Sequence, residues 1–162
     1  MESNLIKRAL ASDNRLTGLA LRIPAGIIFT AHGAQKLFAA FGGYGLEGTG
    51  QWMASIGLEP GYLMALAAGS AEFFGGIALL LGFLVRPAAV VLAFTMLMAI
   101  FTVHLANGLF MSNNGYEFGL SLLTISVALA LNGAGAMSVD GLLTRKWSAA
   151  LDRPLNQSPT SP

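Results

Sequence analysis

Four stretches of the chain are almost entirely apolar, and each approaches the length needed to cross a lipid bilayer. They cover residues 16–38, 62–84, 87–109 and 116–131. A helix that crosses the hydrocarbon core needs about 20 such residues, because each one adds about 1.5 Å along the helix axis. The pattern therefore predicts an all-α protein, an integral membrane four-helix bundle.

Ionisable residues distinguish these stretches from one another. The second contains only Glu72 and the third only His104, whereas Arg22, His32 and Lys36 interrupt the first. Basic residues before the first stretch leave a secretory signal as an alternative, but a signal requires an unbroken apolar region. We therefore expect the first stretch to be a membrane helix as well.

Lysine and arginine residues predict the orientation of the bundle. They occur before the first stretch, between the second and third, and after the fourth: Lys7, Arg8, Arg15, Arg86, Arg145, Lys146 and Arg153. The connections 39–61 and 110–115 contain none. Since basic residues near membrane helices stay on the cytoplasmic side, both termini should be cytoplasmic. An even number of spans gives the same result.

Composition supports a membrane protein and excludes several other classes. Hydrophobic residues make up 54% of the 162 and charged residues 10%, against about 25% charged in soluble domains. A formal net charge of +1 gives no basis for binding nucleic acid. Without cysteine, the chain has no disulfide and no thiolate metal site. We expect a multi-pass protein of the inner (cytoplasmic) membrane, with the lipid bilayer as its main surroundings.

The chain divides into a cytoplasmic N-terminal arm (1–15), a membrane domain (16–144) and a flexible cytoplasmic C-terminal tail (145–162). In the glycine-rich first outer loop, Thr49 should cap a short interfacial helix over residues 51–56, which Gly57 ends. Trp52 would rest at the outer membrane interface. This helix would cover any polar site below it.

Several ionisable residues fall inside the spans, where charge is costly and therefore rare. His32 and Lys36 are four residues apart, on one helical face. Glu72 has Gly69 and Gly76 on its own face, and small residues allow another helix to approach closely. Glu72 is therefore the expected counter-ion of Lys36 or hydrogen-bond partner of His32.

Depth along the helix axes suggests two polar clusters. The outer half of the bundle should hold five residues together: His32, Lys36, Glu72, His104 and Glu117. Towards the cytoplasm, Arg22, Arg86 and Asp140 could form a separate cluster. Simpler interpretations stay open: Arg22 and Lys36 can extend to the nearest interface, Arg86 can serve orientation alone, and a lone histidine is often a core residue. We expect no metal site, because no ligand spacing supports one.

The sequence closely resembles the DoxX family of small bacterial membrane proteins over about residues 22–140. The resemblance rests on the order and spacing of short motifs: Arg22-Ile-Pro-Ala-Gly26, His32-Gly33 with Lys36-Leu37, Gly45-Leu-Glu-Gly48, Ala71-Glu-Phe-Phe-Gly-Gly76, Gly82 with Arg86, His104-Leu-Ala-Asn-Gly108, Gly115-Tyr-Glu117, and Gly133-Ala-Gly-Ala-Met-Ser-Val-Asp140. It implies a four-helix membrane bundle connected with redox chemistry. The family is named for its similarity to a subunit of a thiosulfate:quinone oxidoreductase. Relatives that work in thiol redox would need cysteines, which this chain lacks.

Our leading hypothesis is a component of a quinone-linked membrane oxidoreductase or detoxification system. His32, His104 and Lys36 would donate hydrogen bonds to a quinone beside Trp52, and Glu72 and Glu117 would relay protons. Arg22, Arg86 and Asp140 would serve bundle structure or docking of a redox partner protein. The alternative is a non-enzymatic scaffold for a soluble redox partner, or a small transporter that works as a homo-oligomer.

Overall fold

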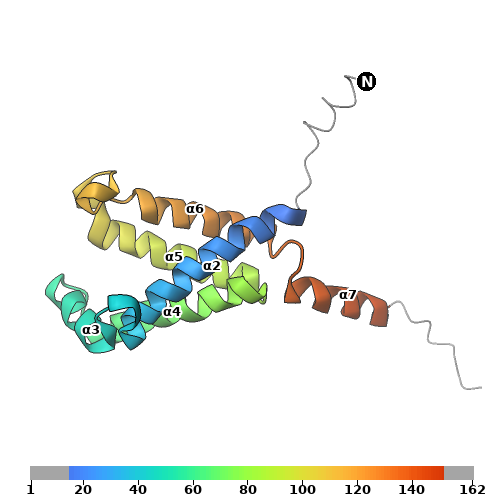
Figure 1. Cartoon of the computed structure of the whole chain (residues 1–162), viewed down its shortest axis with the longest axis horizontal. Helices are drawn as coiled ribbons and strands as arrows, with labels where there is room; N and C mark the ends of the chain where they lie inside the picture. The colour runs from blue at the N-terminus through green and yellow to red at the C-terminus, as the bar shows by residue number, and fades with distance from the viewer. Residues whose placement is uncertain (1–14, 152–162) are drawn as a thin grey trace, which may run out of the picture.

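The computed structural model describes residues 15–151, and this part of the chain is helical without any strand (Figure 1). The longer α-helices are α2 (Arg15–Phe38), α4 (Gly61–Leu81), α5 (Val85–Ala99) and α6 (Glu117–Asn132). Two shorter ones are α3 (Gly45–Ser55) and α7 (Val139–Leu151). The all-α prediction is confirmed for the described residues. Most of the predicted N-terminal arm, and the tail beyond Leu151, lie outside them.

Helices α2, α4, α5 and α6 lie side by side and form the bundle (Figure 1). Helix α2 packs along α4, and α5 packs along α6. The chain enters and leaves the bundle at one end, where α7 begins; we call this the α7 end. Helix α3 and the connection 105–116 lie at the opposite end, which we call the α3 end.

The core of the bundle consists of apolar side chains from all four long helices. Its largest fully buried side chains include Phe29 of α2, Leu79 of α4, Leu92 of α5 and Leu129 of α6. Many large apolar side chains on the outside of the helices remain exposed, among them Phe74, Phe94 and Phe101. Such an apolar exterior suits lipid surroundings better than water.

Two helices of the described chain are long and apolar enough to cross a membrane, Gly61–Leu81 and Val85–Asn107. Helix α6 is apolar but shorter, and α2 carries the charges noted above. The third predicted span is not one regular α-helix. It changes into a π-helical turn at Ile100–His104 and a 3-10 turn at Leu105–Asn107. No pattern of residues along the chain predicts this change in helix type.

Glycines bring α2 and α4 into backbone contact, as the spacing around Glu72 predicted. A Cβ atom on Gly33 would lie 2.6 Å from the Cα of Phe73, and one on Gly76 would lie 2.5 Å from the backbone nitrogen of Thr30. Both distances are too short for any larger residue unless the helices separate. Gly26 and Gly69 approach the other helix in the same way.

Replacing Gly33 by alanine is expected to lower the free energy of unfolding by about 1–2 kcal/mol. The added methyl overpacks the contact with α4, which outweighs alanine's better helix propensity. Unfolding in mixed detergent micelles would measure the change. The matched control is Ile27→Ala, since Ile27 lies on the same helix with 57% of its side chain exposed. Equal stabilities for the two variants would contradict the close packing.

Helix α3 begins earlier than predicted, and Thr49 does not cap it. Tyr44 occupies the N-cap position, while Thr49 lies inside the helix and is buried. The helix starts early because Gly45 adopts a positive φ of 66° and lies against Ala39, which reverses the chain directly after α2. The expected end of the helix near Gly57 is correct to within two residues.

Helix α7 was not predicted. It follows a link of residues 133–138, in which Gly133, Gly135 and Met137 have positive φ angles. Ser138 then accepts a hydrogen bond at Oγ from the backbone nitrogen of Gly141, as a capping serine does. The helix continues to Leu151, into the stretch assigned to a flexible tail.

Candidate functional site

Glu72 is the most buried acidic residue that the structure describes, and it lies on the face of α4 that packs against α2. Lys36 of α2 donates from Nζ to Oε2 of Glu72 at 2.6 Å. The Glu72 side chain is only 4% exposed and that of Lys36 is 24% exposed. The carboxylate is therefore enclosed while the ammonium can be reached from outside. The predicted pairing of Glu72 with Lys36 is confirmed.

The glycine contacts explain how this pair forms. Gly69 and Gly76 precede and follow Glu72 by about one turn, so α2 comes close to α4 on the face that carries the carboxylate. A Cβ atom on Gly69 would lie 3.2 Å from the Cβ of Lys36. At this separation a lysine reaches the carboxylate directly. Pairing removes most of the cost of burying the charge.

His32 lies one helical turn before Lys36, on the side of α2 that faces α6. Its ring is 6.0 Å from the ring of Phe118 of α6, with an interplanar angle of 51°. Among the hydrogen bonds of the described residues, none joins His32 to Glu72. His32 is thus a half-buried residue one helical turn from Lys36 of the ion pair.

His104 and Glu117 are bound to the backbone of the connection 105–116. The Nδ1 atom of His104 lies 2.9 Å from the carbonyl oxygen of Asn114, to which it can donate. Asn107 donates to the same carbonyl at 3.2 Å. Glu117 accepts from the backbone nitrogen of Met111 at 2.6 Å. Of the five residues predicted to converge, the hydrogen bonds thus join only Lys36 and Glu72.

Helix α3, which contains Trp52, follows the end of α2 whose last turn contains Lys36 (Figure 1). The Trp52 side chain is 43% exposed, whereas Met53 is buried against the rest of the protein. Gly50 lets α3 approach α4 closely, since a Cβ there would lie 3.0 Å from the Cα of Tyr62. The helix therefore packs against the end of α4, with Trp52 on its outer surface, and its covering of a polar site stays a prediction. A role for Trp52 in binding stays a prediction.

Arg22 is buried at the α7 end, with 1% of its surface exposed. Its five N–H groups donate to five backbone carbonyls, those of Leu79, Leu80, Ala134, Ala136 and Met137, at 2.6 to 3.3 Å. The first two carbonyls belong to the last turn of α4, where helix carbonyls otherwise lack partners. Arg22 therefore does not extend to the interface. It joins α2, α4 and the link before α7.

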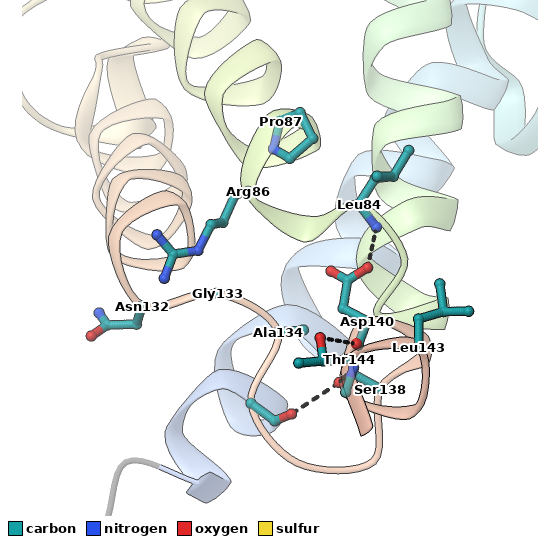
Figure 2. A pocket seen from close by; sticks show the side chains of 12 residues that line it. Leu84, Arg86, Pro87, Asn132, Gly133, Ala134, Ser138, Asp140, Leu143 and Thr144 are labelled. Atoms are coloured by element: carbon teal, nitrogen blue, oxygen red, sulfur yellow. Dashed lines mark hydrogen bonds between the residues drawn. The ribbon is translucent and has the colours of Figure 1, made fainter. Parts of the chain in front are cut away.

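Asp140 of α7 accepts hydrogen bonds from the backbone at the start of α5, whereas Arg22 donates hydrogen bonds to the backbone at the end of α4. The Oδ1 atom of Asp140 accepts from the backbone nitrogen of Leu84 at 2.8 Å (Figure 2), and its Oδ2 atom accepts from the backbone nitrogen of Val85 at 3.0 Å. The carboxylate thus caps the positive end of the α5 dipole. In return, the backbone nitrogen of Asp140 donates to the carbonyl of Gly82. Gly82 has a φ of 66°, which suits glycine where α4 ends.

Arg86 is exposed and points along the link at the end of α6 (Figure 2). Together with Asp140 it lines a cavity of about 490 Å³ at the α7 end. Arg22, Arg86 and Asp140, which the sequence predicts to form a cluster, lie in the same region, but the described residues form no ion pair among them. Arg22 binds carbonyls behind the wall, Asp140 binds backbone nitrogens, and Arg86 faces the cavity.

The prediction from sequence missed the carbonyl acceptors in the link 133–138. They are backbone atoms, so no side-chain pattern marks them. The run Gly133-Ala-Gly-Ala-Met-Ser138 did contain a signal, because two glycines followed by a serine are typical of a turn that starts a helix. Within the described residues, no group of three or more His, Asp or Glu side chains is placed to hold a metal ion.

Comparison with known proteins finds consistent relatives. The model of the DoxX family matches residues 18–105. A Bacillus subtilis (strain 168) protein named "Putative oxidoreductase CatD" is 39% identical over 122 residues, which cover 75% of this chain and 83% of that protein. "Inner membrane protein YqjF" of Escherichia coli (strain K12) is 39% identical over 134 residues, covering 80% and 93%. "Inner membrane protein YphA" of the same organism is 33% identical over 127 residues, covering 75% and 86%. No solved structure matches the chain significantly.

Proposed function

Because the chain belongs to the DoxX family and is a multi-pass inner-membrane protein, we propose that it is a component of a quinone-linked oxidoreductase system. The oxidoreductase part of this proposal is supported by a relative that is itself named as a candidate oxidoreductase. The choice of a quinone rests on the chemistry of the residues around Lys36 and Glu72. Among the residues that the structure describes, Lys36 and Glu72 form the one side-chain salt bridge.

In this proposal, α2, α4, α5 and α6 cross the membrane and both termini are cytoplasmic. The apolar surfaces of the helices and the absence of Lys and Arg from the connections 39–61 and 110–115 support the arrangement. The α3 end is then external. Lys36 and Glu72 lie in the outer half of the membrane, below α3.

The observation that carries the proposal is the enclosed salt bridge between Lys36 and Glu72. Two hydrogen-bonded groups of opposite charge inside a membrane protein typically mark a site of function or a proton path. His32 adds a second donor, and Phe118 and Phe73 supply flat apolar surfaces nearby. These residues fit a weakly polar, lipid-soluble ring with carbonyl oxygens.

A bound quinone would take up electrons from a partner protein, since this chain has no cysteine to carry them. The residues of the chain itself would bind and supply protons. Lys36, which remains 24% exposed, is placed to donate a hydrogen bond to a carbonyl oxygen. Glu72, a carboxylate that holds no proton of its own, would keep the Lys36 ammonium in position, and water from the outer side would supply the replacement proton.

Replacing Glu72 by glutamine is expected to weaken binding of a quinone analogue by about tenfold, because Lys36 loses its charged partner and its position. Titration of the purified protein in detergent with a fluorescent quinone analogue would measure the affinity. Glu47→Gln is the matched control, since Glu47 is an exposed acid on α3. Absence of binding to the natural protein, or equal binding by both variants, would overturn the proposal.

The second candidate function is a scaffold for a soluble redox partner. The direct contact between Lys36 and Glu72 favours it, because a fully paired salt bridge can serve structure alone. On this hypothesis, Glu72→Gln lowers thermal stability in detergent and leaves capture of the partner unchanged. Retained stability together with lost quinone binding would instead exclude the purely structural role.

A further inference from the structure

The cavity at the α7 end is formed where three elements meet: the start of α5, the link after α6 and the start of α7 (Figure 2). Its volume of about 490 Å³ falls within the usual range of ligand pockets. It lies at the opposite end of the bundle from Lys36 and Glu72, so it is a separate site. With α5 and α6 crossing the membrane, as in the proposed arrangement, the cavity at their ends would lie at the level of the lipid headgroups.

One charged group in the cavity wall is free to bind a ligand. Arg86 is exposed, and among the described residues its guanidinium takes part in no salt bridge or hydrogen bond. It lies against Gly133, where a Cβ would be only 3.3 Å from its Nε, so glycine leaves room for the side chain. Arg86 therefore reaches the cavity with all its donors available.

Asp140, Ser138 and Thr144, three other polar residues of the wall, already form hydrogen bonds within the protein. Both carboxylate oxygens of Asp140 accept backbone N–H groups. The hydroxyls of Ser138 and Thr144 donate to the carbonyls of Gly135 and Asp140. Within the described part of the chain, the cavity wall thus contains a cation without a partner, Arg86, beside an anion that is already satisfied, Asp140.

The charges around the cavity and the apolar part of its wall limit the class of ligand that the cavity can bind. Arg86 lies in the wall, and Arg22 donates to the carbonyl of the wall residue Ala134, so cations outnumber Asp140. This arrangement attracts an anion. Leu84 and Leu143 supply apolar surface at the rim, and both are more than half exposed. An anion attached to an acyl chain would match both the excess of cations and the apolar rim.

We propose that this cavity binds the phosphate group of an anionic phospholipid, and that Arg86 is the phosphate ligand. The planar guanidinium presents two parallel donors that match two phosphate oxygens. Basic pockets at the ends of membrane helices are suited to such headgroups. The acyl chains would lie along the exposed apolar faces of α5 and α7. This inference does not depend on the proposed quinone site.

Lipid retention measured by native mass spectrometry would test the proposal. The full chain would be extracted from nanodiscs that contain either phosphatidylglycerol or phosphatidylcholine. We expect phosphatidylglycerol to be retained preferentially, and Arg86→Gln to reduce that retention by about fivefold. Arg145→Gln is the matched control, because Arg145 is an exposed arginine outside the cavity wall. Arg86→Lys should restore only part of the retention, since lysine lacks the planar fork.

Three results would overturn the proposal. Equal retention by Arg86→Gln and the natural protein would show that the cavity does not hold the phosphate. Equal losses in Arg86→Gln and Arg145→Gln would indicate diffuse attraction to the surface. Displacement of the lipid by millimolar inorganic phosphate would assign the site to a soluble phosphorylated ligand instead of a lipid.

Discussion

Replacing Arg22 by alanine is expected to lower the free energy of unfolding by about 3–5 kcal/mol. The change removes five hydrogen bonds at once and leaves carbonyls of α4 and of the link 133–138 without partners. It also removes the positive charge at the C-terminal end of α4, where a cation is favourable. Unfolding in mixed micelles, followed by circular dichroism, would measure the loss.

Two further variants test whether the loss of stability is specific to the guanidinium group of Arg22. Arg22→Lys keeps the charge but has one nitrogen instead of three, so it should recover only a part of the lost stability. Arg145→Ala removes an exposed arginine of α7 and should change the free energy of unfolding by less than about 0.5 kcal/mol. If Arg22→Ala were as stable as Arg145→Ala, the carbonyl network would contribute nothing.

Replacing Lys36 by methionine should be almost as damaging, with a loss of about 3–5 kcal/mol, because Glu72 is left enclosed without a counter-ion. The double variant Lys36→Met with Glu72→Leu should recover most of this loss, since apolar groups of similar volume need no partner. Comparison of both single variants with the double variant gives the coupling energy between the two side chains. Unfolding in mixed micelles would measure the free energy of unfolding of each variant.

An additive result, in which the double variant is as unstable as the sum of the two single ones, would contradict a direct ion pair. The cycle also bears on function. If the double variant is stable yet binds no quinone analogue, the pair has a role beyond packing. A stable double variant that binds the analogue normally would remove the main support for the proposed quinone site.

The salt bridge could be predicted from sequence because local spacing determines it. Gly69 and Gly76 mark the face of α4 that another helix approaches, and Glu72 lies between them. A charge so deep in an apolar helix needs a partner, and Lys36 is at a suitable height on the preceding span. Few other residues combine a charge deep in an apolar helix with an opposite charge at the same height on a neighbouring span.

The convergence of His104 and Glu117 with that pair was argued from depth alone. Depth gives the height of a residue along the bundle axis, but not the direction in which its side chain points. The π-helical turn at Ile100–His104 rotates the end of α5, and His104 there contacts the carbonyl of Asn114. No pattern of apolar residues reveals such a local change in helix type.

The amino-acid sequence by itself determined the helical fold, the family and the inner-membrane location. A long apolar segment in lipid must satisfy its backbone hydrogen bonds internally, and a helix does so from its own residues. Only the tertiary structure decided how the α7 end is built. Arg22 binds carbonyls 57 to 115 residues away, and Asp140 caps a helix that begins 55 residues earlier. These contacts join side chains to backbone atoms that every residue possesses, so they exist only once the helices have packed.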